Sequence, residues 1–203
     1  MAMLTDAERY REIEARVDAR LDRGARLPGA VLRERPRRLA FLEFEAVFSA
    51  ELWEALRALA RHYGDRELFL AAVEPAADAY YHTHFGAYGA LVLPATMDGA
   101  AYEETVAFEP DDNPADSLAI GARVVAIASP SGGLVAWADR ELEVALLALY
   151  DTAEVPAPRE LPAGPGWMDA RRALQVMAPA FPEQRVPTAV ADALLANYPS
   201  ASG

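Results

Sequence analysis

Apolar residues recur at helical spacing near the start of the chain. Ile13, Val17 and Leu21 lie four residues apart among charged neighbours, which is the pattern of one apolar face on an amphipathic helix. The Thr-Asp-Ala-Glu sequence before them has the form of a capping box, with Thr5 placed to accept a hydrogen bond from a free amide of the first turn. We therefore expect a charged helix over about residues 6–22.

The stretch between Ser49 and Gly64 predicts a second helix. Leu52, Leu56 and Leu59 fall on one face at helical spacing. Ser49 suits the N-cap position and Gly64 suits the end of the helix, because serine accepts a hydrogen bond from a first-turn amide and glycine adopts the left-handed conformation freely.

Elsewhere the pattern of apolar runs separated by turn residues favours strands. The run at the end of this list is ambiguous between strand and helix, since Ala and Leu dominate it. The expected strands are Leu39–Phe48, Leu68–Val73, Ala79–Leu93, Glu103–Phe108, Ala122–Ala128, Leu134–Ala138 and Glu141–Tyr150.

The C-terminal quarter changes character. Residues 151–166 hold four prolines, which indicates a linker or strap. Two short helices are expected after it, at Trp167–Met177 and Pro187–Tyr198, with Pro187 in the first turn. They should pack back on the sheet, because their apolar side chains would otherwise be exposed.

These patterns predict an α+β fold: an antiparallel sheet of about five to seven strands, with N-terminal and C-terminal helices covering one face. Residues 1–150 would form the core domain, 151–166 the linker or strap, and 167–203 a helical appendage packed on the core.

Charge is distributed unevenly. The net charge is −12, yet residues 1–40 hold ten Arg against seven acidic residues. Residues 67–122 contain no Lys or Arg and carry ten carboxylates. Such a surface repels nucleic acid and anionic lipid and attracts cationic groups. We therefore expect no nucleic-acid partner and no membrane partner.

The loop that contains Arg33, Arg35, Arg37 and Arg38 is the basic counterpart of this acidic stretch. It has two interpretations: a patch that binds anions or nucleic acid, or a solvated loop that neutralises the acidic part of the same molecule. The overall charge favours the second interpretation.

Several classes of chemistry are absent from the sequence. The chain has no Cys, which excludes thiolate metal sites, disulfides and a thiol nucleophile. Nucleotide-binding glycine motifs, a Gly-x-Ser-x-Gly elbow and a His-Glu-x-x-His motif are also missing. We assign no catalytic residue and no cofactor. Without an apolar leader or span, a cytoplasmic location is expected.

The segment around His82 and His84 is the sharpest candidate for a ligand site. On a strand, Tyr80, His82 and His84 would share one face, and Asp78 would extend the row. Such a pair of imidazoles can bind a metal. A cupin-type site, however, also needs a Glu and a third His, and no His follows residue 84. We assign no metal; contact with another ligand or partner and ordinary half-buried polar packing both stay open.

An acidic segment over residues 98–116 is the candidate partner-binding surface. Its Asp111–Asp116 part lacks the ligand spacing of a calcium loop, so a solvated turn and a surface for a basic protein are the main alternatives. Acidic inhibitors use such surfaces to speed encounter with basic enzymes. The predicted contact residues are Asp98, Tyr102, Glu103, Glu104, Glu109, Asp111, Asp112 and Asp116.

One short stretch carries a family likeness. Residues 131–145, with a Gly-Gly turn, a central Trp137 and an Asp-Arg turn, resemble a hairpin of small bacterial proteins that include immunity proteins of polymorphic toxin systems. The resemblance covers 15 residues and carries over no catalytic residue. Those immunity proteins bind a toxin domain and block it. Together with the acidity and the lack of enzyme motifs, the resemblance implies a binding protein rather than a catalyst.

The favoured expectation is an acidic protein-binding module, of the immunity or inhibitor type, that occludes a basic partner. Aromatic side chains would supply its apolar contacts. The alternatives are a small-molecule or metal-dependent enzyme centred on His82 and His84, and a structural subunit whose acidity keeps it soluble.

Overall fold

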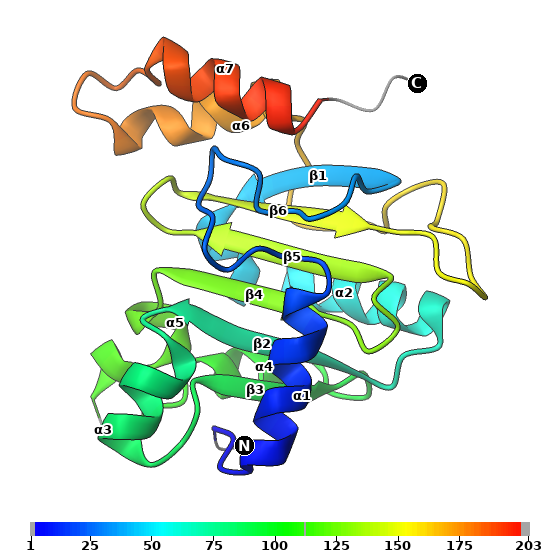
Figure 1. Cartoon of the computed structure of the whole chain (residues 1–203), viewed down its shortest axis with the longest axis vertical. Coiled ribbons are helices and arrows are strands. Elements are labelled where there is room, and N and C mark those ends of the chain that lie inside the picture. Colours follow the sequence, from blue (N-terminus) through cyan, green and yellow to red (C-terminus); the bar gives the residue numbers. More distant parts are fainter. Residues whose placement is uncertain (1–2, 112, 200–203) are drawn as a thin grey trace.

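Six strands form one antiparallel sheet in the computed structural model, which describes residues 3–111 and 113–199 (Figure 1). Their order across the sheet is β1-β6-β5-β4-β2-β3. The predicted α+β fold, with a sheet of five to seven strands and helices from both ends of the chain, is confirmed. The strands are β1 (Arg38–Glu43), β2 (Glu67–Glu74), β3 (Ala90–Pro94), β4 (Val124–Ala128), β5 (Leu134–Asp139) and β6 (Val144–Leu149).

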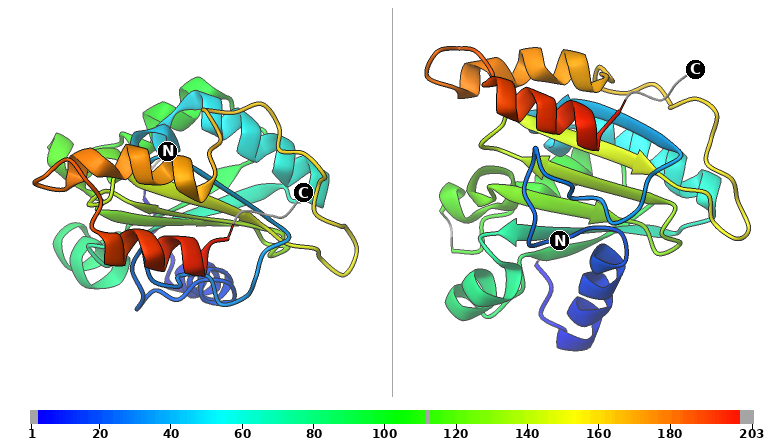
Figure 2. Two further views of the ribbon diagram at one scale, coloured as in Figure 1. Left: turned by 90° about the horizontal axis from the view of Figure 1, so that it is seen from above. Right: turned by 45° about the horizontal axis from the view of Figure 1, so that its top comes forward.

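Both faces of the sheet are covered. The strands β4, β5 and β6 are buried at every residue, which explains why their sequences are continuous apolar runs rather than alternating ones. Figure 2 shows α1 (Ala7–Asp18) and α7 (Thr188–Asn197) on one face, and α2 (Ala50–Tyr63) and α4 (Gly99–Val106) on the other. The helices α1 and α7 therefore cover one face as expected, α2 and α4 cover the second, and the remaining C-terminal helix α6 (Ala170–Met177) packs at the β1 edge.

The two predicted helices of the first third are present. In α1 the N-cap is Asp6 and not Thr5: the Asp6 carboxylate accepts hydrogen bonds from the amides of Glu8 and Arg9. In α2, Ser49 caps the helix as expected, and Gly64 ends it in the left-handed conformation with φ 75°.

The predicted strand Ala79–Leu93 is wrong over its first half. Residues Ala77–His82 form a π-helical turn (η2), which continues into the short helix α3 (Thr83–Phe85). Gly86 then reverses the chain with φ 67°, and β3 begins only at Ala90. The aromatic content of this segment reflects packing of the rings on one another, which a helical turn permits as well as a strand does.

The predicted strand Glu103–Phe108 is also wrong, because it belongs to α4. Asp98 caps this helix by accepting a hydrogen bond from the Ala101 amide at 2.8 Å. Gly99 allows close packing on α2, since a Cβ there would lie 2.6 Å from the Cβ of Ala50. A short apolar run does not separate a strand from a helix, and here the cap and the glycine decide.

The β1 edge of the sheet differs from expectation in length and in its neighbours. The predicted strand Leu39–Phe48 stops at Glu43, and a 3-10 helix, η1 (Phe44–Phe48), follows. The ambiguous run Glu141–Tyr150 contains a strand, β6. Met168 pairs with Phe41 through two backbone hydrogen bonds of 2.8 Å, so the segment before α6 (Ala170–Met177) attaches to the sheet edge.

Short elements complete the chain. Residues 151–166 form no named helix or strand. Pro187 is the N-cap of α7 rather than a first-turn residue.

Among the residues that the structure describes, none of the helices combines the length and apolar character that a membrane crossing needs. The remaining elements are η3 (Pro114–Asp116), α5 (Leu118–Gly121) and η4 (Ala178–Ala180).

Asp139 is a buried carboxyl at the end of β5, only 4% exposed. Its carboxylate accepts hydrogen bonds from the amides of Glu141 at 3.1 Å and Leu142 at 3.4 Å. Burial nevertheless dominates and raises the pKa of Asp139 to about 6. The folded state keeps this proton up to about pH 6, whereas the unfolded chain releases it near pH 4. Folding therefore binds a proton in this window, and stability falls as the pH rises through it.

We predict that Asp139→Asn removes this part of the pH dependence. The free energy of unfolding of the native protein should lose about 2 kcal/mol from this one group between pH 4.5 and pH 7. The asparagine variant, which keeps an acceptor for both amides, should lack that loss. Urea denaturation of both proteins at the two pH values measures the difference, and equal pH dependence in both would contradict the prediction.

Candidate binding surface at one end of the sheet

One end of the sheet gathers carboxylates from several segments. The strand register places Glu43, Val144, Asp139 and Val124 side by side, with Glu74 next to them on β2. The turns at this end are η1, the residues between β5 and β6, the η2–α3 segment and α5 (Figure 1). We call this region the acidic end. It comprises these turns, the helix α4 and the connection from α4 to α5.

Two carboxylates of the cation-free stretch are neutralised by arginines from the first part of the chain. Glu67 pairs with Arg9. Glu74 pairs with Arg26 at 3.0 Å, and Arg123 lies 3.8 Å from its other oxygen. The other carboxylates of this stretch within residues 67–111 and 113–122 form no ion pair with any described residue. Most of the negative charge therefore faces solvent uncompensated.

The carboxylates of α4 have different roles. Asp98 caps its own helix, and Glu103 accepts a hydrogen bond from the Ala50 amide at 2.7 Å, so it stabilises the start of α2. Glu104 is exposed and free of such contacts. Glu103 and Glu104 thus lie on a helix and not on the strand expected over Glu103–Phe108.

The acidic segment meets the His-containing segment at Asp116. Its carboxylate accepts a hydrogen bond from the Asn113 side-chain amide at 2.8 Å and a longer one from the Tyr80 hydroxyl at 3.4 Å. Tyr80 also contacts His84, with ring centroids 4.8 Å apart. The structure therefore joins two candidate sites that the sequence presented separately.

Glu109 is half-buried and Asp111 is exposed in the same connection between α4 and α5. Asp112, the remaining predicted contact residue, lies outside the described residues. The Asn113 side chain accepts a hydrogen bond from the Ala115 amide and so caps η3, the turn that precedes α5.

Tyr102 does not belong to this surface. Its side chain is fully buried, stacks on Trp53 with centroids 4.8 Å apart, and donates a hydrogen bond to the Val47 carbonyl at 2.7 Å. Burial raises the pKa of its hydroxyl. Tyr102 is a core residue that attaches α4 to η1 and α2, so it cannot act as an exposed contact residue.

The two histidines do not converge on one point. On a helical segment, residues two apart do not face each other, and the contacts differ accordingly. The His82 ring stacks on Tyr88, with centroids 4.5 Å apart, and Tyr88 stacks on Tyr10, whereas His84 contacts Tyr80. The described residues contain no group of three His, Asp or Glu side chains that could hold a metal ion. The alternative of an enzyme site centred on His82 and His84 required both side chains on one face of a strand, and the structure does not place them on a strand.

Two exposed apolar side chains lie at the acidic end and were not predicted. Phe108 is 37% exposed and Ile120 is 58% exposed, and they are the only large hydrophobic residues in the exposed class among the described residues. Both fall within the segment from α4 to α5. Their sequence signal is weak, because apolar residues in short elements are ordinarily core residues.

A small pocket extends the same surface toward α6. Its volume is about 480 Å³, and its lining includes Glu43, Glu45 and Glu143. Arg140 connects it to α5: its guanidinium pairs with Glu45 at 2.8 Å and donates to the Ala119 carbonyl at 2.6 Å. The acidic end thus presents carboxylates, two apolar side chains and a concavity together.

The strands of the hairpin that carries the family likeness are interior. Trp137 is fully buried on β5, and the hairpin reaches the surface only at its turns, where Ser131, Glu141 and Glu143 are exposed. No family model, no curated protein and no solved structure matches the chain.

The Tyr81 hydroxyl is a buried polar group without a partner among the described residues. The side chain is fully buried, and burial raises its pKa. It lies close to α5, since a Cβ on Gly121 would be 3.6 Å from this oxygen. An unsatisfied hydroxyl in the interior destabilises the fold.

We predict opposite effects of two matched substitutions. Tyr81→Phe should raise the free energy of unfolding by about 1 kcal/mol, because it removes an unsatisfied hydroxyl. Tyr102→Phe should lower it by about 1 kcal/mol, because it breaks the bond to Val47. Denaturant titration of both variants tests this. Equal destabilisation by both would show that the Tyr81 hydroxyl has a partner.

Proposed function

We propose that this protein is a binding module whose acidic end docks on a basic protein. The observation that carries the proposal is the position of Phe108 and Ile120. The large hydrophobic side chains that the described residues leave exposed both lie within the cation-free stretch. Apolar contacts with a charged periphery are the usual composition of a protein interface.

Each part of the surface has a distinct role in this proposal. Uncompensated carboxylates such as Glu104 and Asp111 accelerate encounter with a cationic surface and disfavour acidic partners. Phe108 and Ile120 supply the affinity that exposed ion pairs do not, because such pairs contribute little in water. The pocket beside Glu43 and Glu143 would accept a Lys or Arg side chain of the partner.

We further propose an inhibitor or immunity role in the cytoplasm, in which the protein covers a cationic cleft of a toxin domain. The charge of this surface, which complements such a cleft, supports this role, and so does the hairpin resemblance at residues 131–145. The buried sheet behind the surface supports it as well, because a rigid support lowers the entropy cost of binding.

Photo-crosslinking inside the native cells tests the surface even while the partner is unidentified. With p-benzoylphenylalanine in place of Phe108, we expect one dominant crosslinked product, and mass spectrometry should identify it as a basic protein. The same probe in place of Glu160, an exposed residue of the segment after β6, is the control and should give no such product. Equal crosslinking from both positions, or crosslinking to an acidic protein only, would contradict the proposal.

Neutralising three carboxylates should weaken binding of that partner. We expect Glu104→Gln, Glu109→Gln and Asp111→Asn together to raise Kd about tenfold at 50 mM NaCl, mostly through slower association. At 300 mM NaCl the effect should shrink, because salt screens exposed charges. Surface plasmon resonance measures both rates.

The matched control for this triple variant is Glu154→Gln, Glu160→Gln and Asp192→Asn. These three residues are exposed and lie outside the acidic end, and their substitution changes the net charge by the same amount. Binding should stay within about twofold of the native protein. If both triple variants weaken binding equally, net charge and not this surface determines the interaction.

A further inference from the structure

A large groove lies at the opposite end of β1 from the acidic end. Its volume is about 1010 Å³. It is bounded by the loop before β1, by the residues after β6 and by the end of α7. The residues that line it include five arginines, Arg20, Arg33, Arg35, Arg37 and Arg38, and the carboxylates of Glu34 and Asp151. We call it the arginine groove.

The charge of this groove is opposite to that of the whole chain. Five arginines against two carboxylates give its lining a formal charge of +3, whereas the whole chain carries −12. Arg35, Arg37 and Arg38 form no ion pair, and their guanidinium groups donate no hydrogen bond, within residues 3–111 and 113–199. The loop is solvated, as one of its two interpretations expected, and no direct ion pair joins its arginines to the acidic segment within the described residues.

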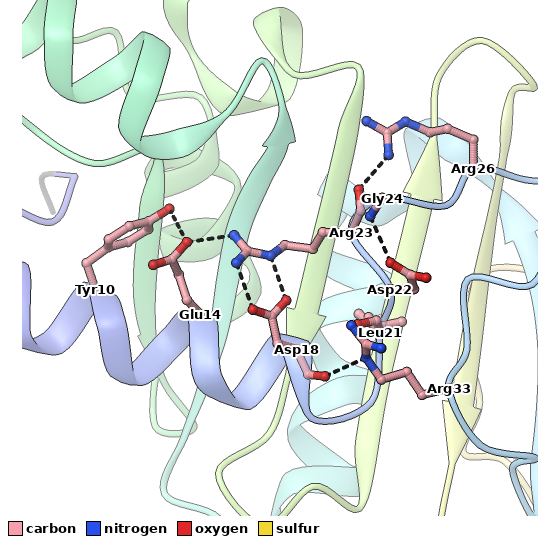
Figure 3. A network of polar contacts seen from close by, with 9 residues as sticks. All are labelled: Tyr10, Glu14, Asp18, Leu21, Asp22, Arg23, Gly24, Arg26 and Arg33. Carbon is pink, nitrogen blue, oxygen red and sulfur yellow. Dashed lines mark hydrogen bonds and ion pairs between the residues drawn. The ribbon is translucent and has the colours of Figure 1, made fainter.

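Three other arginines of the first forty residues, Arg9, Arg23 and Arg26, are paired with carboxylates. Arg23 binds both oxygens of Asp18 at 2.7 and 2.8 Å and Glu14 at 2.6 Å (Figure 3). Arg9 and Arg26 pair with carboxylates of β2. The loop before β1 differs from these three positions because Arg35, Arg37 and Arg38 lie close together in one groove and none of them is paired with a described residue.

Two arginines form an ordered base for the groove. Arg20 lies over the Tyr150 ring at 4.4 Å, donates to the Gly132 carbonyl at 3.2 Å and pairs with Glu34. Arg33 donates to the carbonyls of Asp18 and Leu21 (Figure 3). These contacts fix the direction of both guanidinium groups and lower the entropy cost of binding an anion.

We propose that the arginine groove binds a small ligand that carries two or more consecutive phosphate groups. Arginine presents a planar fork of donors that matches phosphate oxygens. Three unpaired guanidinium groups within one loop can bind several negative charges close together, and a chain of phosphates supplies such charges. The volume is at the upper limit of small-ligand sites, which fits a ligand of nucleotide size.

The rest of the molecule argues against a polymer in this groove. The lining is a local exception within an acidic protein, so a nucleic acid that continued beyond it would meet repulsion. The register of β1 places Glu43 at the far end of the strand from Arg38, about 17 Å away for six residues. A compact polyanion satisfies the groove without reaching that region.

Isothermal titration calorimetry on the full chain with inorganic triphosphate, in 50 mM NaCl with EDTA, tests the proposal. We expect a single site with Kd below about 100 µM. ATP is the second arm: tighter binding of ATP identifies a nucleotide as the ligand, and equal binding identifies an inorganic polyphosphate. Both outcomes support the groove as a phosphate site.

The variant Arg35→Gln with Arg37→Gln should weaken triphosphate binding at least about tenfold, since each removes charge-assisted hydrogen bonds. Its matched control is Arg61→Gln with Arg66→Gln, which removes two exposed arginines from α2 and the following turn; Kd should change less than about twofold. Unchanged circular dichroism spectra and melting temperatures establish that both variants fold.

Three results would overturn the proposal. The first is the absence of saturable triphosphate binding, and the second is equal weakening by both pairs of substitutions. The third is that citrate, a tricarboxylate, or a twelve-nucleotide single strand binds with the same dependence on Arg35 and Arg37 and at least as tightly as triphosphate. That result would replace a phosphate ligand with a general anion or a polymer.

Discussion

Burial of the sheet on both faces is the constraint on which the rest of the structure depends. The strands β4, β5 and β6 expose no residue, and removal of their apolar surface from water is the main stabilising contribution. Unpaired polar groups are costly in such an interior. Polar function is therefore confined to the ends of the strands, the sheet edges and the segments that connect them.

The strand β1 separates the two charged surfaces that result. It begins at Arg38, beside the arginine groove, and ends at Glu43, beside the acidic pocket. Ion pairs from Arg9 and Arg26 to the two ends of β2 join the N-terminal segment to the sheet. At a distance of about 17 Å, which exceeds the Debye length at physiological salt, the two surfaces interact little and can bind independently.

Much of the fold followed from sequence patterns alone. The long amphipathic stretch after Ser49 and the buried runs at β2, β4 and β5 were predicted because their periodicity or length is unambiguous. The segments around Tyr80 and Glu103 were not, because short runs of aromatic and small apolar residues suit a helical turn as well as a strand. The deciding contacts, such as Gly99 against Ala50, join residues far apart in the chain.

The candidate surface was predicted only in part. Charge can be read from the sequence, so the cation-free stretch was evident. Burial cannot be read in this way, so Tyr102 was expected at the surface and is in the core. The exposure of Phe108 and Ile120 was missed for the same reason. The arginine groove combines the loop before β1 with Tyr150 and the end of α7, a combination that exists only in the folded chain.

Chemical-shift mapping by NMR on one isotope-labelled sample tests the central claim that two independent surfaces of opposite charge exist. An arginine-rich peptide should shift amides of residues 98–121 and of η1, and inorganic triphosphate should shift amides of residues 30–39 and of the end of α7. Saturation with one ligand should leave the affinity for the other within about twofold. Shifts from both ligands in the same residues, or shifts spread evenly over the chain, would contradict the claim.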